Sequence, residues 1–178
     1  MKLKSLLTVT LLTLMHSTTQ ASVMDETREI AKICYDTVDN SQFCTTDNLG
    51  NVQVFIYNAG WCPPCNTEVR ELSQSYKQFA GKPVTFASLS GEGFESKSQP
   101  NKAFLEKWKA KHKIPFIVAG KYKDFGQAYG ATGSIPFTVI VNKQGNISSK
   151  GFMSSSSVVA KVKQLLNTDF GSCMPDLE

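Results

Sequence analysis

This sequence of 178 residues has little histidine and no visible repeat. It holds two His, and its 12 Gly and seven Pro follow no period, which excludes a collagen-like or repeat protein. The formal net charge is only +4, so charge supplies no argument for a nucleic-acid partner. Hydrophobic residues make up 41%, which excludes a disordered chain and predicts one globular domain with a substantial core.

The sequence also lacks an apolar run of the roughly 20 residues that a bilayer-spanning helix needs. Two lysines and a shorter apolar stretch open the chain, and the small residues Thr19 and Ala21 follow. This pattern predicts a cleaved secretory signal peptide over residues 1–21, with an uncleaved N-terminal membrane anchor as the alternative. We therefore expect a periplasmic or secreted protein in an oxidising compartment, where disulfides persist.

Hydrophobic periodicity predicts alternating strands and helices in the rest of the chain. Apolar spacing favours an amphipathic helix over residues 25–38, within an N-terminal helical extension of residues 22–41. A main domain over residues 42–167 and a C-terminal tail at 168–178 follow. Predicted strands lie at residues 42–45, 52–57, 84–89, 115–118, 135–141 and 147–152, and predicted helices at 69–79, 101–113, 125–129 and 158–166. The alternation predicts an α/β fold with helices on both faces of a sheet.

A pair of cysteines, in the sequence Cys62-Pro63-Pro64-Cys65, stands where a predicted buried strand turns into a helix. A thiol at a helix N-terminus faces unpaired backbone N–H groups and the positive end of the helix dipole, which favour its thiolate. Cys62 is therefore the candidate nucleophile, and Cys65 the candidate resolving cysteine. The alternatives are half of a zinc site, for which a second such pair is lacking, and a purely structural disulfide.

The sequence from Trp61 to Glu68, WCPPCNTE, and the later Ser134-Ile135-Pro136 resemble the thioredoxin family in its exported TlpA/ResA-like branch. The resemblance covers residues 42–167. It implies a thioredoxin-like fold, in which a central mixed β-sheet carries an inserted strand–helix segment around residues 84–113. It implies no cofactor, whether metal, nucleotide or flavin.

The resemblance also implies a substrate-binding surface beside the cysteine pair. Pro136 is expected to follow a cis peptide bond and to present the backbone of Ile135 to an extended substrate chain. A trans proline that only begins a strand is the alternative. Trp61, Pro63 and Pro64 are expected to shape the same surface, although ordinary packing also accounts for the tryptophan.

Glu68 is the third candidate catalytic residue. It stands three residues after Cys65 and thus on the same helical face, where a carboxylate can accept the proton when Cys65 attacks. Ordinary thioredoxins keep an acidic residue on the strand before the motif, whereas this chain has Ile56 at the matching place. Glu68 resembles the TlpA/ResA-like replacement for that group, and a solvated surface glutamate is the alternative.

The other three cysteines, Cys34, Cys44 and Cys173, are candidates for a structural disulfide. In an oxidising compartment we expect two of them to pair and one to remain. A Cys34–Cys44 bond closes a short loop, whereas a bond to Cys173 ties the tail to the body of the protein. Sequence alone leaves the pairing open.

Lysines crowd the end of one predicted helix, in the sequence KWKAKHK of residues 107–113. We expect a solvated face there, which also carries His112, and a patch for a partner is the alternative.

The functional hypothesis is an exported thiol–disulfide oxidoreductase that acts on protein thiols and disulfides, in the reducing direction. The TlpA/ResA-like resemblance implies cytochrome c maturation as one setting and a membrane electron donor or acceptor as a partner. It implies no nucleic acid and at most peripheral membrane contact. The alternatives are a disulfide oxidase or isomerase, and a thioredoxin-fold binding module without redox activity.

Overall fold

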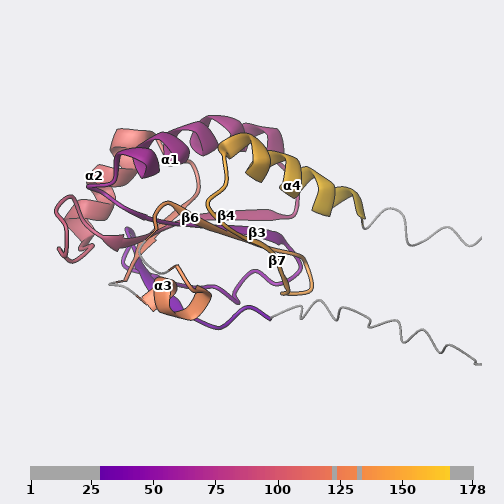
Figure 1. Cartoon of the computed structure of the whole chain (residues 1–178), viewed down its shortest axis with the longest axis horizontal. Coiled ribbons are helices and arrows are strands. Elements are labelled where there is room, and N and C mark those ends of the chain that lie inside the picture. The colour runs from indigo at the N-terminus through magenta and orange to yellow at the C-terminus, as the bar shows by residue number, and fades with distance from the viewer. Residues whose placement is uncertain (1–28, 122–123, 132–133, 169–178) are drawn as a thin grey trace, which may run out of the picture.

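A mixed sheet of seven strands forms the centre of the molecule, in a computed structural model that describes residues 29–121, 124–131 and 134–168 (Figure 1). The strand order is β2-β1-β5-β4-β3-β6-β7. β4 is parallel to β3 and β5, and the other neighbours are antiparallel. The strands are β1 (Cys34–Thr37), β2 (Gln42–Cys44), β3 (Val52–Ala59), β4 (Val84–Glu92), β5 (Ile117–Gly120), β6 (Phe137–Val141) and β7 (Ile147–Gly151).

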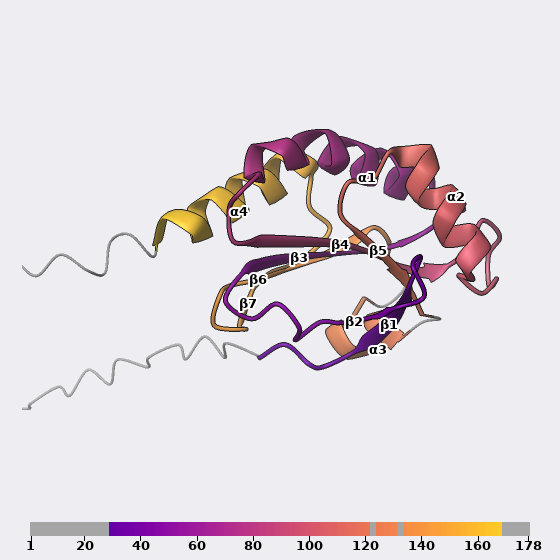
Figure 2. The same ribbon diagram turned by 180° about the vertical axis from the view of Figure 1, so that it is seen from behind.

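Helices cover both faces of this sheet, as the sequence predicts. α1, α2 and α4 lie on one face, and α3 lies on the other beside the β1–β2 hairpin (Figures 1 and 2). Their bounds are α1 (Pro63–Ser75), the 3-10 helix η1 (Tyr76–Phe79), α2 (Lys102–His112), α3 (Asp124–Tyr129) and α4 (Ser155–Thr168). Among the described residues, none of these helices has both the length and the apolar character that crossing a bilayer requires.

The central strand β3 divides two layers of core. Successive side chains of a strand point to opposite faces. Val54 and Ile56 therefore pack under α1, α2 and α4, whereas Phe55 and Tyr57 pack toward α3 and the hairpin. All eight residues of β3 are buried, which is why its sequence places apolar residues on both faces rather than alternating apolar with exposed polar residues.

The predicted N-terminal helix is wrong where the structure describes it. Within the predicted helix 25–38 and the helical extension 22–41, the described residues instead form an isolated bridge at Glu29 and the strand β1. β1 pairs with β2 on one side and with β5 on the other. The reason is tertiary, because the two free edges of the hairpin and of β5 satisfy each other's backbone groups.

The burial pattern of β1 has the period of a strand. Tyr35 and Thr37 are buried, whereas Asp36 between them is exposed. The apolar residues whose spacing favours the predicted helix include Ile30 and Ile33, but neither lies in a helix, and both pack into the core on the α3 side of the sheet.

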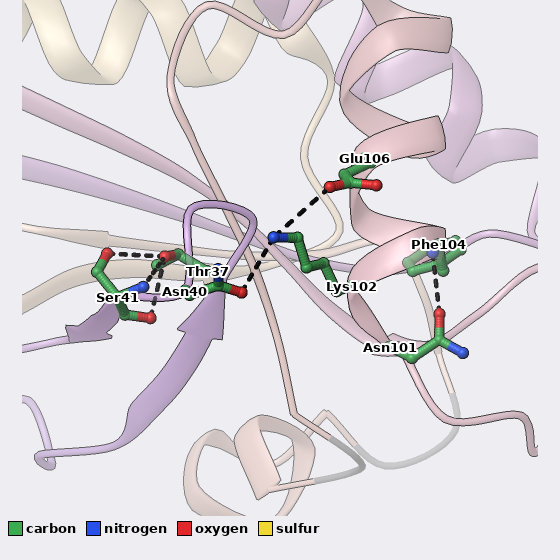
Figure 3. Close-up of polar contacts among 7 residues, drawn as sticks. All are labelled: Thr37, Asn40, Ser41, Asn101, Lys102, Phe104 and Glu106. Carbon is green, nitrogen blue, oxygen red and sulfur yellow. Dashed lines mark hydrogen bonds and ion pairs between the residues drawn. The ribbon is translucent and has the colours of Figure 1, made fainter.

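Polar contacts attach the hairpin turn to the start of α2 (Figure 3). Lys102 Nζ donates a hydrogen bond of 3.0 Å to Asn40 Oδ1 and lies 3.8 Å from Glu106 Oε1. The side chain of Asn101 caps α2 by accepting a hydrogen bond from the backbone N–H of Phe104 at 2.9 Å. The Lys102–Asn40 hydrogen bond links α2 to the hairpin at the edge of the sheet, and the other two contacts stabilise the start of the helix.

The remaining predicted elements within the described residues are present, with boundaries that differ by a few residues. The predicted signal peptide at residues 1–21 lies outside the described residues, as do Cys173 and residues 169–178 of the predicted tail.

Candidate active site

Cys62 is the N-cap residue of α1, three residues after the end of β3. Its sulfur accepts a hydrogen bond of 3.2 Å from the backbone N–H of Cys65. Pro63 and Pro64 occupy the first helical turn, where the missing N–H groups would have no helical partner in any case. The local sequence therefore directs one free N–H group of the helix N-terminus, that of Cys65, at the sulfur of Cys62.

The two cysteines form a disulfide, with 5.3 Å between their Cα atoms. Cys65 is completely buried and Cys62 is 2% exposed, whereas Pro63, Pro64 and Trp61 are exposed. The disulfide thus lies just beneath a surface made by its own neighbours in the sequence.

The peptide bond between Ile135 and Pro136 is cis, so the alternative of a trans proline is excluded. β6 follows this bond and pairs with β3, which brings it to the same end of the sheet as the cysteines. The carbonyl oxygen of Ile135 lies 3.8 Å from the sulfur of Cys62. Ile135 also packs against the small buried cluster of Ala59, Cys62 and Cys65.

Glu68 is buried on the inner face of α1, together with Cys65. It is 6% exposed, so it is not a solvated surface glutamate. Its Oε1 accepts a hydrogen bond of 2.9 Å from Thr138 Oγ1, and its Oε2 has no hydrogen-bond partner among the described residues. Burial raises the pKa of Glu68 from its ordinary 4.5 to about 7, opposed by the Thr138 hydrogen bond and reinforced by the nearby carboxylate of Glu71.

Thr138 is a site residue that sequence reasoning missed. It is completely buried on β6, directly opposite Ile56 of β3. The acidic group therefore comes from the helix, and the neighbouring strand supplies its partner. The available signal was one hydroxyl within the otherwise apolar strand 137–141.

Glu92, at the end of β4, is a second residue that sequence reasoning missed. Its Oε2 accepts hydrogen bonds from the indole N–H of Trp61 at 2.6 Å and from the backbone N–H of Lys97 at 2.8 Å. Trp61 remains 43% exposed. The loop after β4 thus holds the tryptophan at the surface beside the disulfide.

Two further predictions are resolved outside this centre. Cys34 and Cys44 form a disulfide with 4.0 Å between their Cα atoms, at facing positions of β1 and β2.

The prediction of a solvated His112 is wrong, because this side chain is 7% exposed and its ring centroid lies 4.3 Å from that of Trp108. The two rings share the inner stripe of α2 because they are four residues apart.

A family model named Redoxin matches residues 23–166, so the chain belongs to that family. Nucleoredoxin from Mus musculus is 26% identical over 111 residues, which are 61% of this chain but a quarter of that protein's length. A thioredoxin-family thiol:disulfide interchange protein from Chlorobium tepidum has 21% identity and a TM-score of 0.64, over 78% of this chain and 96% of the other. A secreted disulfide oxidoreductase from Mycobacterium tuberculosis, homologous to DsbE of E. coli, has 19% identity and a TM-score of 0.60, over 75% and 96%.

These likenesses confirm the thioredoxin-like fold and the resemblance seen in the sequence. The family, the fold and the disulfide at the start of α1 define a thioredoxin-like thiol–disulfide oxidoreductase.

Proposed function

We propose that this protein is exported and reduces disulfides in protein substrates. The observation that carries the proposal is the Cys62–Cys65 disulfide at the N-terminus of α1, which lies against the cis Ile135–Pro136 segment. This arrangement provides a nucleophile, a resolving thiol and a backbone for a substrate chain.

The exchange begins from the reduced protein. The Cys62 thiolate attacks one sulfur of the substrate disulfide, that bond breaks, and a substrate thiolate leaves. Cys65 then loses its proton and attacks the sulfur of Cys62 in the mixed disulfide. The second substrate thiolate departs, the Cys62–Cys65 disulfide forms, and the substrate has gained two electrons. The backbone N–H of Cys65 and the positive end of the α1 dipole stabilise the Cys62 thiolate as the attacking group.

Glu68 accepts the proton of Cys65 in the second step. The two side chains share the buried face of α1, one turn apart. A pKa near 7 suits a proton acceptor at neutral pH. Thr138 engages one carboxylate oxygen and the other has no partner among the described residues, so that oxygen can take the proton.

The substrate chain binds over the exposed rim of the site. Ile135 offers backbone groups beside the sulfur of Cys62, in the manner of strand addition. Trp61, Pro63 and Pro64 supply an exposed apolar surface around it.

Three observations support export. Residues 1–21 have the pattern of a secretory signal, the described residues hold two disulfides, and the Mycobacterium tuberculosis protein of similar fold is secreted. In an oxidising compartment a reductant must be recharged, which calls for a membrane electron donor. The TlpA/ResA-like resemblance extends the proposal to apocytochrome c as a substrate.

Insulin reduction by dithiothreitol tests the activity. We expect the wild type to accelerate precipitation of the insulin B chain, and Cys62→Ser to return it to the uncatalysed rate. Equal rates for the two proteins would leave only a binding module. The reduction potential of the Cys62/Cys65 pair then tests the direction. A value of about −270 mV or lower supports a reductase, and a value of about −120 mV would make the protein an oxidant.

A further inference from the structure

An open pocket of about 370 Å³ lies between α1 and α2, which run side by side (Figures 1 and 2). Its lining contains three cationic side chains and no carboxylate among the described residues. The lining residues are Arg70, Ser73 and Gln74 from α1, with Lys111, His112 and Lys113 from the end of α2.

The positive charge of this pocket is not neutralised within the described residues. Their one ion pair, Lys102–Glu106, lies at the opposite end of α2. Glu71 follows Arg70 in the sequence, but its Oε2 accepts a hydrogen bond of 2.8 Å from Ser155 of α4. The carboxylate nearest along the chain is therefore engaged with α4, away from α2.

The wall of the pocket includes a buried polar group without a partner. His112 is 7% exposed, and its Nε2 has no hydrogen-bond partner among the residues that the structure describes. Burial, together with the smaller effects of the Lys111 and Arg70 charges, lowers the pKa of His112 from its ordinary 6.5 to about 4. The neutral ring thus lies in a positive field that an incoming anion would offset.

Hydrogen bonds connect this pocket to the reactive cysteine. Lys111 Nζ donates to Asn66 Oδ1 at 2.7 Å, and Asn66 Nδ2 donates to the carbonyl oxygen of Cys62 at 2.7 Å. Lys111 also lies 5.9 Å from the ring centroid of Phe94, which is 40% exposed. The basic pocket and the apolar rim around Trp61 therefore belong to one surface at the active site.

Building on the disulfide exchange proposed above, we propose that the α1–α2 pocket docks an acidic segment of the redox partner, whose aspartate or glutamate carboxylates meet Arg70, Lys111 and Lys113 while its cysteine reacts with Cys62. Charge complementarity selects this occupant, because three unneutralised cations and a buried ring without a partner favour an anion. Such contacts raise association rates and weaken as salt screens them.

Single-turnover exchange with two synthetic peptides tests the docking. Both peptides carry the same intramolecular disulfide and differ at four flanking positions, which are glutamate in one and glutamine in the other. With protein reduced beforehand and freed of dithiothreitol, we expect the glutamate peptide to react about tenfold faster at low ionic strength, and about twofold faster in 0.5 M NaCl.

Charge-matched variants locate the effect. Arg70→Gln/Lys113→Gln lowers the glutamate-to-glutamine rate ratio below about threefold. Lys77→Gln/Lys82→Gln removes two exposed charges outside the pocket lining, one in η1 and one in the turn before β4, and keeps the ratio near tenfold. A cysteine-free glutamate peptide shifts the ring resonances of His112 in the wild type, which detects docking without redox chemistry.

Equal rates for the two peptides would overturn the docking and leave the exchange itself standing. No exchange with either peptide would overturn the proposed function and the docking with it. If inorganic phosphate shifts the His112 resonances but the glutamate peptide has no advantage, the pocket binds small anions, and the acidic-segment proposal fails.

Discussion

The two disulfides of the described residues lie in opposite settings. Cys62–Cys65 spans the first turn of α1, where the backbone N–H of Cys65 donates to the sulfur of Cys62. Cys34–Cys44 joins facing residues of β1 and β2 near the edge of the sheet. There the backbone N–H of Cys44 donates to the carboxylate of Asp47 at 2.7 Å. The first setting favours a thiolate, whereas in the second the nearby polar contact is between a carboxylate and the backbone N–H of Cys44. We therefore assign redox chemistry to Cys62–Cys65 and stabilisation of the fold to Cys34–Cys44.

The largest expected difference is in thiol reactivity. After complete reduction, we expect iodoacetamide at pH 6 to label Cys62 about a hundredfold faster than Cys34 or Cys44, because only Cys62 has the helix N-terminus to favour its thiolate. Peptide mapping by mass spectrometry after timed quenching measures the rates, and labelling in 6 M guanidinium chloride is the control. Similar labelling rates in the folded protein would show that the burial of Cys62 outweighs the effect of the helix N-terminus, since Cys34 is more exposed than Cys62.

The hairpin disulfide is expected to matter for stability instead. Because the cysteines are ten residues apart, Cys34→Ser/Cys44→Ser should lower the free energy of unfolding by about 2–3 kcal/mol through a less constrained unfolded chain. Urea unfolding followed by circular dichroism measures the loss. The rate of insulin reduction should stay within about twofold of the wild type at 25 °C. A parallel loss of insulin reduction in protein that is still folded would mean that electrons pass through both disulfides.

Sequence reasoning succeeded where local pattern decides the structure. The buried strand β3 and the proline-bearing cysteine pair can each be recognised from about ten residues of sequence, and the family resemblance supplied the cis bond at Pro136. It failed for β1, whose strand conformation depends on pairing with β5, more than 80 residues later in the chain. The spacing of Ile30 and Ile33 was compatible with both structures.

The hydrogen-bond partners of Glu68 and Trp61 also could not be predicted from the sequence. Thr138 meets Glu68 across 70 residues, and Glu92 meets Trp61 across 31. A side chain's solvation also depends on tertiary packing, which is why His112 was assigned to the wrong face of α2. The pairing of Cys34 with Cys44 needed the register of the hairpin, which places them directly opposite each other.

A proton acceptor is a further difference between the two disulfides, and Glu68→Gln removes it. We expect the second step, release of substrate from the mixed disulfide with Cys62, to slow about tenfold or more at pH 8. In the wild type this step should accelerate as pH rises through about 7, the pKa of Glu68, whereas the variant should lack that inflection. Stopped-flow measurement of release from a preformed mixed disulfide gives the profile. An unchanged profile would assign the proton to water.

Glu68→Gln should also change how the free energy of unfolding depends on pH, in a direction fixed by the raised pKa. The pKa of Glu68 is higher in the folded protein than its ordinary 4.5, so folding favours the protonated acid. That contribution is complete below about pH 4.5 and is lost as pH rises through about 7, at a cost of about 3 kcal/mol. Glu68→Gln should therefore remove this decline, which urea unfolding at pH 5 and pH 8 detects. If the free energy of unfolding changed equally between pH 5 and pH 8 in the wild type and in Glu68→Gln, the raised pKa would be contradicted.

The smallest expected effect concerns Thr138, a positioning residue whose hydroxyl donates a hydrogen bond to Glu68. Its hydrogen bond opposes the rise in the pKa of Glu68, so Thr138→Val should move the inflection of the release step to higher pH. The release rate at pH 7 should fall about two- to threefold, because less of the carboxylate is ionised. Thr138→Ser, which keeps the hydroxyl, should restore the wild-type inflection. A lower rate with an unmoved inflection in Thr138→Val, and no rescue by serine, would mean that Thr138 only packs between β3 and α1. No buried proton acceptor is assigned to the hairpin disulfide. The pH dependence of thiol exchange at Cys34–Cys44 should therefore lack this inflection in both Thr138→Val and Thr138→Ser.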